Sequence, residues 1–76
     1  MPKAARYNKQ GEVIMSSLAY HRKIFSVPEF SKITGIPYQT LHRRLCVNFG
    51  RATADEIRAM IKGAAMTGEE IEEVFR

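Results

Sequence analysis

A histidine and a cysteine, His42 and Cys46, stand four residues apart near the middle of the chain. On a helix this spacing places both side chains on one face, which suits a pair of metal ligands or a cysteine–histidine dyad. Two ligands do not make a metal site, and no third histidine, cysteine or nearby carboxylate is arranged to join them. We therefore expect a surface histidine beside a half-buried thiol, without a metal or any other cofactor.

The sequence also lacks the patterns that are typical of enzymes. It contains no phosphate-binding loop and no activated serine, and its eight carboxylates fall mainly at positions that are exposed on helices. We expect neither catalytic activity nor a small-molecule substrate.

The charged residues are divided unevenly along the 76 residues, which carry a formal net charge of +4. From Met1 to Arg51 nine Lys and Arg residues face two Glu residues, a balance of +7, whereas the remainder has three basic and six acidic residues, a balance of −3. A basic section on a compact domain favours binding to a polyanion, most commonly a nucleic acid. The acidic remainder is typical of a solvated face.

The length and composition indicate one small domain that folds by packing alone. With 45% hydrophobic residues the chain matches a globular protein, and its single cysteine excludes an internal disulfide. No apolar run approaches the roughly 20 residues that a membrane span needs, and the first residues lack the apolar stretch of a signal peptide. We expect a cytoplasmic protein without a membrane partner.

Residues 1–8 have no apolar period and are predicted to form a flexible basic arm, followed by a domain over residues 9–76. Apolar residues at three- and four-residue steps predict a helix over about 9–23, with Asn8 as its N-cap. The sequence Ser26-Val27-Pro28-Glu29 is a capping box that starts a second helix, which should bury Phe30 and Ile33 and end at Gly35.

Three further helices are predicted. The first covers about Pro37 to Val47, with Leu41 and Leu45 facing inward and Gln39, His42, Arg43 and Cys46 facing largely the other way. Capping boxes at Thr53-Ala54-Asp55-Glu56 and Thr67-Gly68-Glu69-Glu70 begin a helix over about 54–65 and a last helix near the C-terminus. The prediction is an all-α compact bundle of about five short helices.

The segment VPEFSKITGIPYQTLHRRLC, Val27 to Cys46, has the pattern of a helix-turn-helix: two short helices joined by a turn that contains a glycine. It resembles the phage repressor and Cro family of DNA-binding proteins. The resemblance is specific over these twenty residues and architectural elsewhere, and it implies a lambda-repressor-like fold whose second motif helix enters the major groove.

The resemblance also implies roles for individual residues. The base-contacting residues would be Tyr38, Gln39, His42 and Arg43, and the residues near phosphates would be Thr40, Arg44, Asn48 and Arg51. Gln can bond an adenine edge in a bidentate manner, Arg a guanine edge, and Tyr can touch a thymine methyl group. Lys3 and Arg6 of the arm are expected to add contacts to the backbone.

The resemblance also implies a homodimer on a two-fold operator in double-stranded DNA. Dimers of this class place two recognition helices about 34 Å apart, one turn of DNA, so that the second subunit doubles the contacts. The expected interface consists of apolar residues at the end of the chain: Met66, Ile71, Val74 and Phe75. A core-capping role for this stripe is nearly as well supported by the sequence.

The leading hypothesis is a transcriptional regulator, with repression as its expected direction. An antitoxin or a phage recombination-directionality factor could use the same motif. From another class, a protein-interaction module such as an antirepressor would bind a partner through its acidic C-terminal helices.

Overall fold

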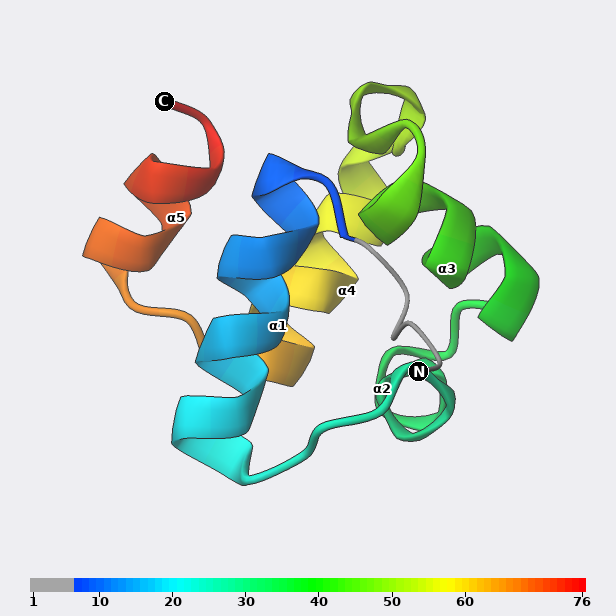
Figure 1. The fold of residues 1–76 in the computed structure, drawn as a ribbon, viewed down its shortest axis with the longest axis horizontal. Helices are drawn as coiled ribbons and strands as arrows, with labels where there is room; N and C mark the ends of the chain where they lie inside the picture. Colours follow the sequence, from blue (N-terminus) through cyan, green and yellow to red (C-terminus); the bar gives the residue numbers. More distant parts are fainter. Residues whose placement is uncertain (1–6) are drawn as a thin grey trace, which may run out of the picture.

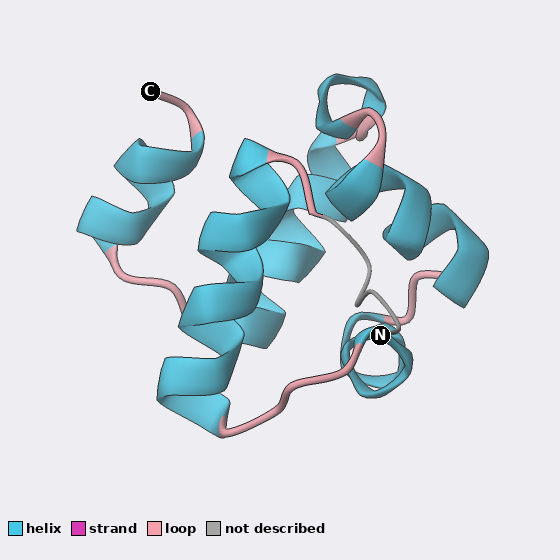
Figure 2. Ribbon diagram, in the orientation of Figure 1, coloured by secondary structure: helices cyan, strands magenta, loops and turns pink. Residues whose placement is uncertain are grey.

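The computed structural model describes residues 7–76, and this part of the chain is built from helices and loops, without a strand (Figure 2). The elements are α1 (Lys9–Arg22), α2 (Val27–Thr34), α3 (Tyr38–Cys46), a single 3₁₀ turn (Phe49–Arg51), α4 (Ala54–Ala64) and α5 (Gly68–Val74). The prediction of an all-α bundle of about five short helices is confirmed.

Helix α1 lies at the centre of the bundle and packs against α3, α4 and α5, while α2 packs against α3 and α4 (Figure 1). The innermost side chains come from four of the five helices, and each is almost completely excluded from solvent: Ile14, Leu18, Phe30, Leu41, Leu45 and Met60. Helices α3 and α5 lie on opposite sides of α1 in Figure 1. The core therefore holds α3 against α1 at a distance from the acidic end of the chain.

Local capping accounts for most of the helix boundaries. Asn8 caps α1, as predicted, because its side-chain oxygen accepts a hydrogen bond of 2.7 Å from the Gly11 amide. The boxes at Thr53 and Thr67 form with both of their reciprocal hydrogen bonds. Lys23 and Ala65 take left-handed backbone conformations, and so α1 and α4 each end one residue earlier than predicted.

The box predicted at Ser26 does not form, although α2 begins where it was expected. The Ser26 hydroxyl donates to the Glu29 carboxylate at 3.4 Å, and no helix amide donates to it. Pro37 serves as the N-cap residue of α3 in an extended conformation, so this helix starts at Tyr38 and is shorter than predicted at both ends.

The predicted inward position of Ile33 is wrong, because this side chain is 42% exposed. Val27 and Phe30, one turn apart, already fill the buried face of the two-turn α2. Ile33 lies at the edge of that face, beside Gly63 of α4. Conversely, Phe49 of the 3₁₀ turn is buried in the core, although the sequence analysis predicted no core residue between the third and fourth helices.

The start of α1 is fixed to the end of α3 by backbone contacts. The Asn8 amide donates to the Leu45 carbonyl at 2.8 Å, and the Asn8 side chain donates to the Arg44 carbonyl at 3.1 Å. Gly11 lies so close to the same turn that a Cβ atom there would overlap the Leu45 carbonyl oxygen. Asn8 and the half-buried Tyr7, both assigned to the arm by the sequence prediction, thus pack with the bundle. Residues 1–6 of that arm lie outside the described residues.

Polar contacts of Glu70 join helix α5 to α1. The His21 Nε2 atom lies 3.0 and 3.1 Å from the two carboxylate oxygens of Glu70. The pKa of Glu70 is lowered, first by the hydrogen bond from the Thr67 amide and then by His21, against the opposing effect of burial.

We predict that Gly11→Ala destabilises the protein by about 1 to 3 kcal/mol, because the added methyl group forces α1 away from the Leu45 carbonyl. This loss should exceed the gain in helix propensity, which is about 1 kcal/mol. Gly68→Ala is the matched control, since nothing lies within 4 Å of a Cβ atom at that glycine. Urea unfolding of both variants measures the difference, and equal stabilities would contradict the contact.

A second prediction concerns acid. Because the pKa of Glu70 is lower in the folded protein than in the unfolded chain, its contribution is fully present above the ordinary glutamate pKa of about 4.3 and is lost as the pH falls through the lowered value. Glu70→Gln keeps an oxygen for the helix cap, and should lower stability at pH 7 while flattening the loss of stability below pH 4.3. Thermal unfolding across pH, with the exposed Glu69→Gln as control, measures this. Parallel acid limbs in the two variants would contradict it.

Candidate nucleic-acid interface

The segment from α2 to α3 folds as two helices joined by a tight turn. In Figure 1 α2 is seen end-on whereas α3 runs across the view, so the two helices cross steeply. Gly35 has a φ of +79°, which favours glycine, and its backbone amide donates to the Ser31 carbonyl. The Ser31 hydroxyl donates to the Ile36 carbonyl, and the Ile36 amide donates to the Thr34 hydroxyl at 3.2 Å. These bonds fix the start of α3 relative to α2.

The inner face of α3 is fully buried at Leu41 and Leu45. Its outermost stripe consists of Gln39 and Arg43 and is continued by the C-cap residue Val47, at intervals of four residues, and all three are exposed. None of the ion pairs found within residues 7–76 involves Arg43. An amide and a guanidinium one turn apart thus project together from a helix that is immobilised on its other side.

A second stripe of α3, formed by Tyr38, His42 and Cys46, lies beside Tyr7. The ring centroids of Tyr38 and His42 are 5.7 Å apart, and His42 Nε2 lies 3.6 Å from the Cys46 sulfur. Burial raises the pKa of the Cys46 thiol. The pKa of Tyr7 is raised by burial first and then by the nearby Cys46 and Tyr38. Tyr38 remains exposed, whereas His42 and Cys46 are half-buried.

The opposite flank of α3 faces α4. Thr40 is half-buried there, and the Nε atom of Arg44 lies 3.1 Å from the Glu56 carboxylate. Arg44 also donates to the Asn48 side chain at 3.3 Å. The pKa of Glu56 is lowered, first by the hydrogen bond from the Thr53 amide and then by Arg44, with burial acting in the opposite direction. Arg44 and Asn48 are thus engaged within the protein, unlike Arg51, which is exposed in the 3₁₀ turn.

The sequence-predicted DNA-contacting residues do not share one surface: Thr40 is half-buried on α3, and Arg51 is exposed in the 3₁₀ turn. Tyr38, Gln39, His42 and Arg43 do share the outward half of α3, whereas Arg44 and Asn48 turn toward α4. Lys3 and Arg6 lie outside the described residues. The sequence analysis did not predict the pairing of Arg44 with Glu56. One signal was present: Arg44 lies between the outward-facing Arg43 and the inward-facing Leu45, at the side of the helix.

The expected dimer interface changes in one respect. Val74 is only 3% exposed, because it packs into the chain's own core, and it is therefore not on the surface. Met66 and Ile71 are half-buried. Phe75 is 57% exposed and rests against the Phe49 ring, with 6.2 Å between centroids.

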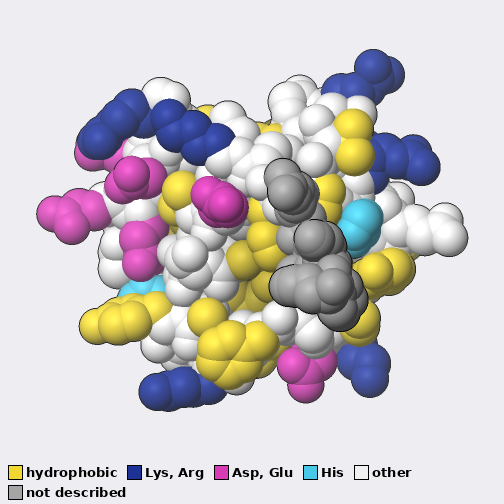
Figure 3. Space-filling model, viewed as in Figure 1, with side chains coloured by type: hydrophobic (Ala, Val, Ile, Leu, Met, Phe, Trp, Pro, Cys, Tyr) yellow, Lys and Arg dark blue, Asp and Glu magenta, His cyan; other side chains and the backbone are white. Residues whose placement is uncertain are grey.

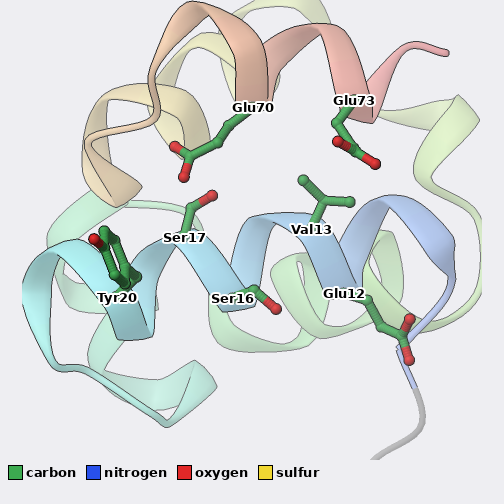
Figure 4. A pocket seen from close by; sticks show the side chains of 7 residues that line it. All are labelled: Glu12, Val13, Ser16, Ser17, Tyr20, Glu70 and Glu73. Atoms are coloured by element: carbon green, nitrogen blue, oxygen red, sulfur yellow. The ribbon is translucent and has the colours of Figure 1, made fainter.

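An open groove lies between α1 and α5, away from α3 (Figure 4). Val13 forms an apolar part of its wall, the exposed Tyr20 lies at one end, and Glu12, Glu70 and Glu73 supply three carboxylates. Figure 3 shows acidic side chains gathered over α5, with Lys or Arg side chains next to them on the same side, and further Lys or Arg side chains beside α3. In this view most of the acidic side chains are concentrated on one side, whereas the cationic ones are spread around the molecule.

Within residues 7–76 no helix is long and apolar enough to cross a membrane. The same residues contain no group of three or more His, Cys, Asp or Glu side chains that could hold a metal ion. Comparison of the chain with protein-family models, with curated proteins and with solved structures finds no match.

Proposed function

We propose that the protein is a sequence-specific double-stranded DNA-binding transcriptional regulator of the repressor and Cro type. The observation that carries the proposal is the exposed stripe of Gln39 and Arg43 on α3, behind which Leu41 and Leu45 anchor the helix in the core. A rigid helix with free bidentate side chains is what reading of base edges in the major groove requires.

The side chains around the stripe fit the same role. Tyr38, at the exposed start of α3, can contact a thymine methyl group, and His42 lies one turn further along the same side. Arg51 can contact a phosphate from the 3₁₀ turn. Tyr7 and Asn8 are held against α3.

The proposed regulator binds a two-fold operator as a homodimer. Phe75, with support from Ile71 and Met66, is the residue that we assign to the contact between copies, because it presents an aromatic ring at the surface next to the buried Phe49.

The groove between α1 and α5 favours one second candidate, a protein-interaction module. Glu12, Glu73 and the exposed Tyr20 suit a partner with basic side chains, and the groove is lined by α1 and α5, away from α3. Salt-dependent binding to duplex DNA separates the two functions, since only the regulator must displace counterions from phosphates.

We predict that Gln39→Ala and Arg43→Ala each cost about 1 to 3 kcal/mol at the preferred site and relax the choice of base at one position, because each removes a bidentate partner. Arg51→Ala should instead weaken preferred and random sites alike and reduce the log–log salt slope by about one unit. Selection of bound duplexes, followed by salt titration of each variant, measures both effects. If Arg43→Ala weakened all sequences equally with an unchanged motif, Arg43 would not be reading bases.

We also predict that Phe75→Glu lowers operator affinity through lost dimerisation, with little change in the fold, because the charge would be buried between copies. Tyr20→Glu introduces the same charge at an exposed aromatic residue of α1 and serves as control. Sedimentation with and without operator DNA measures the association. A native protein that is monomeric in both conditions would rule out the interface.

A further inference from the structure

Arg44 differs from its neighbour Arg43 in exposure and in pairing with a carboxylate. The two arginines are consecutive in α3, but Arg43 is exposed, whereas the side chain of Arg44 is 18% exposed and that of its partner Glu56 is 21% exposed. Consecutive residues on a helix point about 100° apart, and this rotation directs Arg44 toward α4.

Hydrogen bonds fix both side chains of the pair. Glu56 Oε1 accepts from Arg44 Nε at 3.1 Å and from the Thr53 amide at 3.0 Å. Arg44 Nη1 donates to the Asn48 side chain at 3.3 Å. The Glu56 carboxylate is therefore held in place by the helix cap of α4, and it holds the Arg44 side chain against α4.

We propose that Glu56 is a positioning residue that withholds Arg44 from the DNA backbone and so weakens the sequence-independent part of binding. The inference rests on the proposed function. An arginine free to contact phosphate strengthens binding to every sequence, because the release of counterions does not depend on the bases. By pairing with Arg44, Glu56 leaves Arg43 as the guanidinium that α3 offers to DNA, and lowers the part of the binding free energy that does not depend on sequence.

The chain supplies a closely matched control. Asp55 precedes Glu56 in the first turn of α4 and pairs with Arg58 at 3.4 Å, on an exposed surface. Glu56→Gln and Asp55→Asn each remove one negative charge from the same turn and each release one arginine. Only Glu56→Gln releases an arginine of α3, and its side-chain oxygen can still accept from the Thr53 amide.

The experiment measures the salt dependence of binding to a random-sequence duplex for the native protein, for both single variants, and for Arg44→Gln with and without Glu56→Gln. We expect Glu56→Gln to steepen the log–log slope by about one unit relative to Asp55→Asn. Arg44→Gln should leave the native slope unchanged but abolish the added unit in the Glu56→Gln background.

Two results would overturn the inference. Equal slopes for Glu56→Gln and Asp55→Asn would show that Glu56 does not restrain Arg44, and a shallower slope for Arg44→Gln alone would show that Arg44 already contacts phosphate. The comparison of Glu56→Gln with Asp55→Asn decides the question even if Arg44→Gln fails to fold. Absence of salt-dependent binding by the native protein would instead refute the proposed function.

Discussion

The attachment of the start of α1 to the end of α3 is the contact on which the arrangement of the molecule depends. Asn8 caps α1 with its side-chain oxygen while its amide groups donate to the carbonyls of Leu45 and Arg44. A helix end leaves carbonyl groups without partners, and here another helix start satisfies two of them. The absence of a side chain at Gly11 permits the close approach. Helix α3 is thereby fixed at its C-terminal end by α1 and at its N-terminal end by the turn after α2.

Two carboxylates in the acidic part of the chain attach it to the basic part. Glu56 and Glu70 both cap their own helices and both pair with a basic side chain from another helix, Arg44 and His21. Each contact joins a late helix to an earlier one. Whether a basic residue is free to bind a ligand therefore depends on two things: its exposure, and whether it pairs with a carboxylate of the protein.

Local sequence patterns were sufficient where the interactions are local. The Thr-x-x-Glu boxes predicted the starts of α4 and α5, and Gly35 predicted the turn before α3. The same pattern failed at Ser26, because the hydroxyl bonds the Glu29 carboxylate and not a helix amide. Helical spacing gave the buried Leu41 and Leu45 but also Ile33, since a two-turn helix has too few positions to define its buried face.

Contacts between distant residues could not be predicted in this way. Arg44 and Glu56 are 12 residues apart and His21 and Glu70 are 49 apart, so their pairing depends on how the helices pack. Val74 shows the same limit, because an apolar stripe at a chain end has the same pattern whether it faces a partner or its own core. The exposed half of α3 was predictable because its buried half is marked by two leucines.

The most direct test of the central claim is to observe which side chains lie against bases. Isotope-edited nuclear Overhauser spectra of the complex with a duplex selected for binding would provide this. We expect contacts from the side chains of Gln39 and Arg43 to major-groove protons, such as cytosine H5 and thymine methyl groups. Contacts that came only from residues of the groove between α1 and α5, with none from α3, would contradict it.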